Sequence, residues 1–333
     1  MSSCELALTS GYNIGGVRGC QKRKKMAIVK SLSVGEGDMF YIRHNTDNFS
    51  IIDCCIEAGR HNGIVSELKK MSEDKTIKRF ISTHPDDDHI RGMARLFSDL
   101  EIPNFYCVKN EAYNPEGGDD FDKYCELRNG KSSFYIERDC KRKWMNLSSE
   151  SDDDERRGGA GINILWPIVK NQEYRSVLSK VKDWCDPNNL SPIIRYSIDK
   201  GVSFAWFGDM EATFQEKIKD EIVLPNTDIV FAPHHGRKSG HIVNKWLREL
   251  NPKLIVVGEA PSEHLCYYCG YDTITQNTAG DITFVCEGDQ TDVYVSNAGY
   301  DPDCIKLKNA TKVLTKVNHR HNPEYGYYVG TIE

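Results

Sequence analysis

Short apolar runs alternate along the chain with polar turns rich in Gly, Asp and Pro. Runs of this length and composition predict β-strands at 27–32, 39–43, 49–52, 77–82, 162–166, 192–197, 202–207, 229–232, 253–257, 282–286 and 293–296. Apolar positions at helical spacing predict helices over 59–71, 89–100 and 211–221. Two series of strands with helices between them fit an α/β (α+β) chain whose two sheets pack face to face, with the helices outside.

Three stretches lack this regular pattern and divide the chain. Residues 1–25 are rich in glycine and end in a basic run, which indicates an N-terminal extension before a domain at 26–298. Residues 108–160 are polar and include the acidic run 148–155, so we interpret them as an insertion or lid on which a protein partner could dock. Residues 299–333 are not strongly periodic and form a C-terminal tail.

Composition narrows the class of protein. The chain has 333 residues, 39% of them hydrophobic, which is enough for a real core. No apolar run approaches the roughly 18 residues of a membrane span, and no leader precedes a cleavage site, so we expect a cytoplasmic protein. The net charge of −6 disfavours a protein that coats nucleic acid. The 12 cysteines are scattered and read as reduced, and the single CxxC at Cys266 and Cys269 is weak support for zinc or redox chemistry.

One strand end carries metal-ligand chemistry. In the loop 83–89, His84, Asp86, Asp88 and His89 place two imidazoles and two carboxylates within six positions. A loop between a strand and a helix lets such side chains converge, and this ligand mixture suits Zn²⁺, Mn²⁺ or Fe²⁺. An acidic helix cap would account for one Asp but not for the histidines.

Two further strand ends have the same character. The run 202–207 leads into Gly208-Asp209, and the run 229–232 leads into Pro233-His234-His235-Gly236. A lone Asp after a strand is usually a turn residue, and a lone His pair is usually at the surface. Three such strand ends in one chain favour a common site, because loops at strand ends converge in layered α/β proteins.

The order of these motifs resembles the metallo-β-lactamase-fold hydrolases, and within them the branch that contains the soluble domain of ComEC, the bacterial DNA-uptake channel protein. The resemblance covers about 26–298 and rests on Val34-Gly35-Glu36-Gly37-Asp38, Ile51-Ile52-Asp53, His84-x-Asp86-x-Asp88-His89-x-x-Gly92, Asn189-Leu190-Ser191, Phe207-Gly208-Asp209 and Pro233-His234-His235-Gly236. It implies a four-layer αββα sandwich with a metal site, usually binuclear and here Zn or Mn, at one edge.

The resemblance also implies a ligand set and a supporting acid. The implied ligands are His84, Asp86, Asp88, His89, Asp209 and one of His234 and His235, of which we take His234. Asp53 would orient the loop from behind. The chain departs from the common pattern in having Asp86 where His is usual, and in having no His between positions 90 and 233, so one metal position lacks its usual imidazole.

These ligands predict hydrolysis by an activated water. Asp88 would hold the attacking hydroxide, and His235, if not a ligand, would donate a proton to the leaving group. Arg237 and Lys238 are either phosphate-binding or ordinary surface charge, and His264 is a late ligand or a substrate contact. The leading hypothesis is a phosphodiesterase or nuclease acting on a nucleic acid or nucleotide. The alternatives are an ester, lactam or thioester hydrolase, and a metal-binding partner subunit of a larger assembly such as a defence system.

Overall fold

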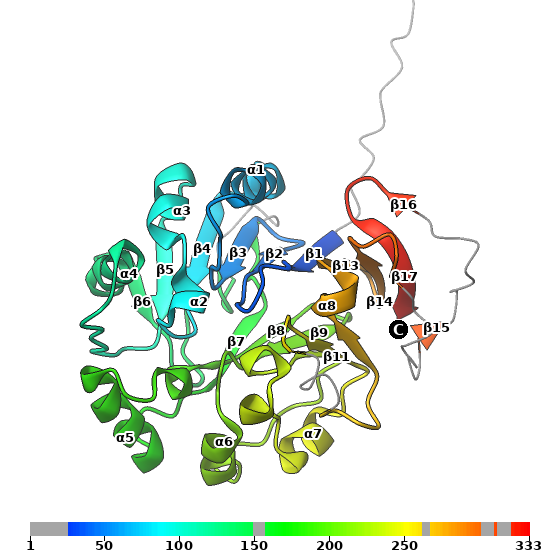
Figure 1. Cartoon of the computed structure of the whole chain (residues 1–333). Helices are drawn as coiled ribbons and strands as arrows, with labels where there is room; N and C mark the ends of the chain where they lie inside the picture. Colours follow the sequence, from blue (N-terminus) through cyan, green and yellow to red (C-terminus); the bar gives the residue numbers. More distant parts are fainter. Residues whose placement is uncertain (1–25, 149–156, 262–266, 301–309, 312–320) are drawn as a thin grey trace, which may run out of the picture.

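The computed structural model describes residues 26–148, 157–261, 267–300, 310–311 and 321–333. Two β-sheets pack face to face, and helices cover the outer face of each (Figure 1). The predicted four-layer αββα sandwich is therefore confirmed.

The first sheet has the strand order β15-β17-β14-β13-β1-β2-β3-β4-β5-β6, with β16 paired to β17. Its strands are β1 (Met26–Ser31), β2 (Phe40–Arg43), β3 (Asn48–Ile52), β4 (Ile77–Ile81), β5 (Asn104–Cys107), β6 (Ser133–Tyr135), β13 (Ile282–Glu287), β14 (Gln290–Val295), β15 (Ala310–Thr311), β16 (His321–Asn322) and β17 (Gly326–Ile332). Strands β3 to β6 run parallel to one another, so their carboxyl ends lie at one edge of the sheet.

The second sheet has the order β12-β11-β10-β9-β8-β7. Its strands are β7 (Ile162–Trp166), β8 (Ile193–Ser197), β9 (Ser203–Trp206), β10 (Ile229–Phe231), β11 (Leu254–Val257) and β12 (Thr273–Thr275). Strands β9, β10 and β11 are parallel and buried at every position. Burial on both faces explains why they read as continuous apolar runs.

The longer helices lie outside both sheets, whereas the short α2 and α8 lie where the two sheets meet (Figure 1). Their bounds are α1 (His61–Ser72), α2 (Asp87–Ile90), α3 (Met93–Asp99), α4 (Asp119–Asn129), α5 (Gln172–Lys180), α6 (Ala212–Ile218), α7 (Asn244–Leu250) and α8 (Gln276–Ala279). Helices α1, α3 and α4 cover the first sheet, and α5, α6 and α7 cover the second (Figure 1). None of the helices in the described ranges is long and apolar enough to cross a membrane.

Aromatic side chains join the two sheets. The Phe40 ring lies 4.9 Å from Phe231 and 6.1 Å from Trp206, and Phe284 lies 5.6 Å from Phe204, measured between ring centroids. Edge-to-face pairs at these distances add to the hydrophobic gain of burial. This packing fixes one sheet against the other and so fixes the relative positions of their strand ends.

The predicted helix 89–100 is two helices. Gly92 has φ +82°, a left-handed conformation that ends α2 and begins α3. The hydrophobic spacing continues across this break because Ile90 of α2 and Met93 and Leu96 of α3 are all buried.

Two stretches that we set apart from the domain supply parts of the first sheet. The stretch 108–160 contributes α4 and β6, and β6 pairs with β5. The stretch 299–333 contributes β17, which pairs with β14. β6 is only three residues long, and β17 contains glycines at positions 326 and 330, so neither strand gives a strong pattern. Most of the acidic run 148–155 lies outside the described residues, as does the extension 1–25.

Candidate metal centre

The three predicted strand ends meet at one edge of the sandwich. His84 lies in the loop that follows β4 in the first sheet, and His89 lies in α2 directly after that loop. Asp209 follows β9, and the short 3₁₀ helix His234–Gly236 follows β10 in the second sheet. The backbone N–H of His234 donates to Gly208 O at 3.0 Å and ties the last two loops together. Residues far apart in the chain thus converge because the two sheets face each other.

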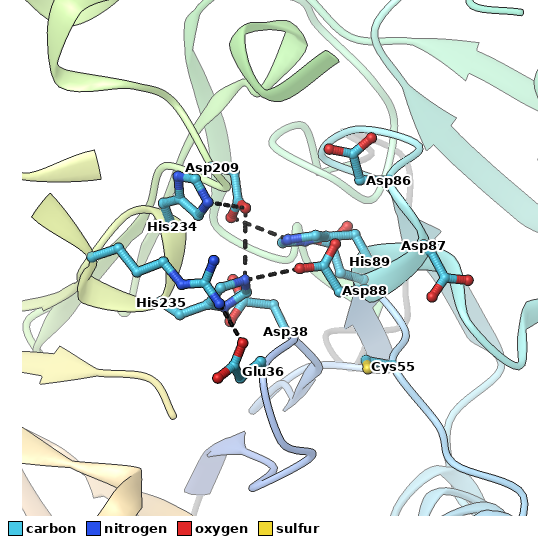
Figure 2. A network of polar contacts seen from close by, with 12 residues as sticks. Glu36, Asp38, Cys55, Asp86, Asp87, Asp88, His89, Asp209, His234 and His235 are labelled. Carbon is cyan, nitrogen blue, oxygen red and sulfur yellow. Dashed lines mark hydrogen bonds and ion pairs between the residues drawn. The ribbon is translucent and has the colours of Figure 1, made fainter. Parts of the chain in front are cut away.

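Four imidazoles surround one buried carboxylate. The Nε2 atom of His89 lies 3.1 Å from Asp209 Oδ1. The Nε2 atoms of His235, His234 and His84 lie 3.6, 3.7 and 4.0 Å from Asp209 Oδ2. Figure 2 shows Asp209 facing His89, His234 and His235 at the centre of this cluster.

Carboxylates hold the far side of two of these rings. His89 Nδ1 lies 2.9 Å from Asp53 Oδ2, and His235 Nδ1 lies 3.1 Å from Asp38 Oδ1. An ionised carboxylate only accepts hydrogen bonds, so each Nδ1 donates, and Nε2 is the ring nitrogen left to face Asp209. This is the arrangement that prepares an imidazole as a metal ligand.

Hydroxyl groups hold the other two rings. Thr83 Oγ1 donates to Asp53 Oδ2 at 2.6 Å, so its oxygen accepts from His84 Nδ1 at 3.0 Å. His234 Nδ1 lies 2.9 Å from Ser239 Oγ. Ser191 Oγ accepts from the backbone N–H of Asp209 at 3.0 Å and also lies 3.3 Å from His84 Nδ1. Each histidine therefore presents Nε2 to the same carboxylate.

Two further carboxylates approach the histidines. Asp88 Oδ2 lies 3.2 Å from His235 Nε2, and Asp86 Oδ2 lies 3.6 Å from His84 Nε2. Asp88 points into the cluster, whereas Asp87 points away from it (Figure 2). Asp87 instead pairs with Arg91.

The donor set fits a divalent cation. His84 Nε2, His89 Nε2 and Asp209 Oδ1 are buried and have no hydrogen-bond partner. Ligand atoms of Asp38, His89, Asp209 and His235 lie within 4.8 Å of one another. Buried polar atoms are nearly always satisfied, and imidazole with carboxylate suits zinc, manganese or iron. The buried Asp/His cluster could hold a metal ion.

The charged groups of the cluster shift one another's pKa values. Burial by itself would lower the pKa of His235, but the carboxylates of Asp209 and Asp38 raise it to about 10. Burial would raise the pKa of Asp209, yet His89 and His235 hold that pKa well below its usual range. Protonated imidazoles thus balance the carboxylates, and a bound cation would take the place of those protons.

A left-handed turn brings two adjacent histidines to the same carboxylate. His234, His235 and Gly236 have φ of +52°, +55° and +86°. Such angles are costly for residues other than glycine and cluster at functional sites. Neighbouring side chains of a strand would point to opposite faces, so this turn is needed for both imidazoles to reach Asp209.

Close packing holds Asp38 beside His235. A Cβ atom added at Gly37 would lie 2.5 Å from Cys55 Sγ and 2.7 Å from Asp88 O. The backbone N–H of Asp38 donates to Asp88 O at 3.1 Å. The turn that carries Asp38 therefore rests directly on the loop that follows β4.

The structure brings most of the predicted site residues together: Asp53, His84, Asp86, Asp88, His89, Asp209, His234 and His235. It does not separate His234 from His235, since both approach Asp209. The predicted role of His235 as proton donor to the leaving group does not fit its position, because its side chain is 0% exposed, whereas that of His234 is 16% exposed.

Other assignments have different outcomes. Arg237 forms an ion pair with Glu36, and Lys238 begins a second 3₁₀ helix, Lys238–Gly240. His264 lies outside the described residues. Sequence reasoning gave no role to Asp38, although its turn was part of the motif series, and none to Ser239.

No protein-family description matches this chain, and no curated protein matches it. Among solved structures it is similar to Igni18, a metallo hydrolase from Ignicoccus hospitalis (12% identity, 70% of this chain and 83% of that one, TM-score 0.38). It is also similar to CmlA, a diiron β-hydroxylase from Streptomyces venezuelae (13% identity, 70% of this chain and 44% of that one, TM-score 0.37). A third similar structure is a long form RNase Z from yeast (11% identity, 78% of this chain and 42% of that one, TM-score 0.36).

The chain spans less than half the length of CmlA and of the yeast RNase Z. At these identities and TM-scores, the likeness says nothing about substrate. The layers, strand order and site described above are properties of this chain itself.

Proposed function

We propose that this protein is a metal-dependent hydrolase that cleaves phosphodiesters. The observation that carries the proposal is the convergence of four Nε2 atoms on Asp209, each with its Nδ1 held by another side chain. A structural ion pair needs one histidine for one carboxylate. Four prepared imidazoles at one carboxylate are the composition of a metal centre.

Asp88 approaches His235, and Asp86 approaches His84. On this basis Asp88, His89 and His235 would be the set that holds one cation, and His84, Asp86 and His234 would be the set that holds the other, with Asp209 shared. In the second set, His234 would supply the imidazole that the sequence lacks between positions 90 and 233. Two cations held in this way would lower the pKa of a water and polarise the bond under attack, which suits the in-line displacement at a phosphodiester.

The chain's own residues would position and deprotonate the water. Asp88 combines contact with the cluster and access to solvent, since its side chain is 31% exposed and its Oδ2 lies 3.2 Å from His235 Nε2, a closer approach than the 3.6 Å of Asp86 Oδ2 to His84 Nε2. It would accept the proton of the attacking water. Asp209 is 3% exposed and would hold the two sets in register rather than meet substrate.

Metal analysis followed by a substrate screen tests the proposal. We expect the purified protein to contain Mn²⁺ or Zn²⁺, and to cleave bis-p-nitrophenyl phosphate, single-stranded DNA, RNA or a cyclic nucleotide in a chelator-sensitive reaction. Asp209→Asn should lose both metal and activity. Asp74→Asn removes a half-exposed carboxylate that pairs with Arg43, and should keep both. Equal rates with and without chelator would refute the proposal, and faster turnover of an ester or lactam would favour the alternative bond.

A further inference from the structure

An ion pair bridges two of the loops that form the cluster. Arg237 Nη2 donates to Glu36 Oε2. Arg237 directly follows the turn that carries His234 and His235, and Glu36 lies two residues before Asp38. Glu36 lies beside the cluster, with its carboxylate turned outward from Asp38 (Figure 2). The pair thus stands at the rim of the candidate centre.

The backbone around both Glu36 and Arg237 is well packed. On the Glu36 side, Gly35 N donates to Glu259 Oε1 at 3.2 Å, and Gly37 fits tightly against Cys55. On the other side, Arg237 N donates to His234 O at 2.9 Å. The backbone of this turn therefore fixes the point from which the Arg237 side chain extends, whether or not Glu36 is present.

The guanidinium has donor capacity that Glu36 does not use. Arg237 Nε is buried and has no hydrogen-bond partner. The side chain as a whole is 30% exposed, and that of Glu36 is 58% exposed. Exposed ion pairs contribute little to stability. A partly exposed guanidinium beside a metal cluster, bonded to Glu36 through Nη2, is suited to bind an oxyanion when that bond opens.

We propose that Arg237 binds the phosphoryl oxygens of the substrate, and that Glu36 is an internal competitor that occupies the guanidinium until the substrate displaces it. This inference rests on the proposed function and deepens it. Carboxylate and phosphate use the same planar donors of arginine, so one excludes the other. Glu36 would also repel a phosphate that approached the site without engaging Arg237.

Binding of inorganic phosphate to the Mn²⁺-loaded protein, measured by titration calorimetry, tests this assignment. Arg237→Gln should weaken binding roughly tenfold, since a charge-assisted contact is lost. Glu36→Gln should strengthen binding about threefold, because the competitor is removed. Asp74→Asn, which breaks the comparable Arg43 pair, should leave binding unchanged. Arg237→Lys keeps the charge without the fork and should fall between wild type and Arg237→Gln.

The direction of the Glu36→Gln effect decides the matter. If Glu36 only braces Arg237, Glu36→Gln will weaken phosphate binding together with Arg237→Gln, and the competitor role is overturned. Unchanged affinity in Arg237→Gln, with circular dichroism like that of wild type, overturns the subsite itself. Phosphate binding breaks no bond. If both variants shift phosphate affinity as predicted but the protein hydrolyses no substrate, the phosphate subsite stands and the proposed hydrolase function fails. If the protein hydrolyses phosphodiesters but neither variant shifts phosphate affinity, the proposed function stands and the subsite fails.

Discussion

Asp53 provides the sharpest test of how the centre is built. Its carboxylate is 1% exposed and accepts three hydrogen bonds, from Thr83 N at 2.7 Å, Thr83 Oγ1 at 2.6 Å and His89 Nδ1 at 2.9 Å. Through Thr83 it also holds His84. Asp53→Asn keeps the shape but replaces one acceptor oxygen by an NH₂ group. That group must face a donor: the backbone N–H of Thr83 if it stands at the Oδ1 position, or both the hydroxyl of Thr83 and the ring N–H of His89 if it stands at the Oδ2 position.

The expected magnitude follows from this mismatch. Removal of an outer partner of a ligating histidine lowers metal affinity about 10- to 100-fold, or roughly 1.4–2.8 kcal/mol. A buried donor without an acceptor costs about 1–3 kcal/mol of folding stability as well. We therefore expect Asp53→Asn to fold, to unfold at lower denaturant concentration, and to bind Mn²⁺ or Zn²⁺ at least tenfold more weakly.

Competition with a chromophoric chelator measures the metal affinity, and circular dichroism shows that the variant is folded. Asp99→Asn is the matched control, because Asp99 Oδ2 accepts from His61 Nε2 at the same 2.9 Å but outside the cluster. It should leave the metal affinity unchanged. A folded Asp53→Asn protein with wild-type affinity would show that His89 is not a ligand prepared by Asp53.

Two other changes have defined outcomes. Gly37→Ala places a Cβ 2.7 Å from Asp88 O, so the turn must move Asp38 away from His235. We expect the free energy of unfolding to fall by about 1–3 kcal/mol and metal binding to weaken. Unchanged values in denaturant unfolding and chelator competition would show that the turn accommodates the methyl group without moving Asp38. Burial lowers the pKa of Lys75 to about 8, below its value of 10.5 in the unfolded chain. Between these values the unfolded state binds more protons, so the free energy of unfolding should rise with pH from 8 to 10.5. Denaturant titrations at pH 7.5 and 9.5 should show a smaller rise in Lys75→Gln, and an equal rise would remove Lys75 as the cause.

The sequence by itself determined the strands and the chemistry at their ends. The strands are short apolar runs, and hydrophobic burial imposes that pattern locally whatever the rest of the chain does. Predicted strands such as 162–166 and 229–232 correspond closely to β7 and β10. The loop that carries His84 and His89 could be predicted because both histidines lie within six positions, so no knowledge of long-range contacts is needed.

Only the tertiary structure decided how the ligands are held. Asp38 meets His235 across 197 positions of sequence, and Ser191 meets His84 across 107. Such pairs depend on how two sheets pack, and no local pattern encodes that. The approach of both His234 and His235 to Asp209 depends on left-handed backbone angles that residue type disfavours. The sandwich supplies the contacts that hold this turn, and with it the arrangement of the centre.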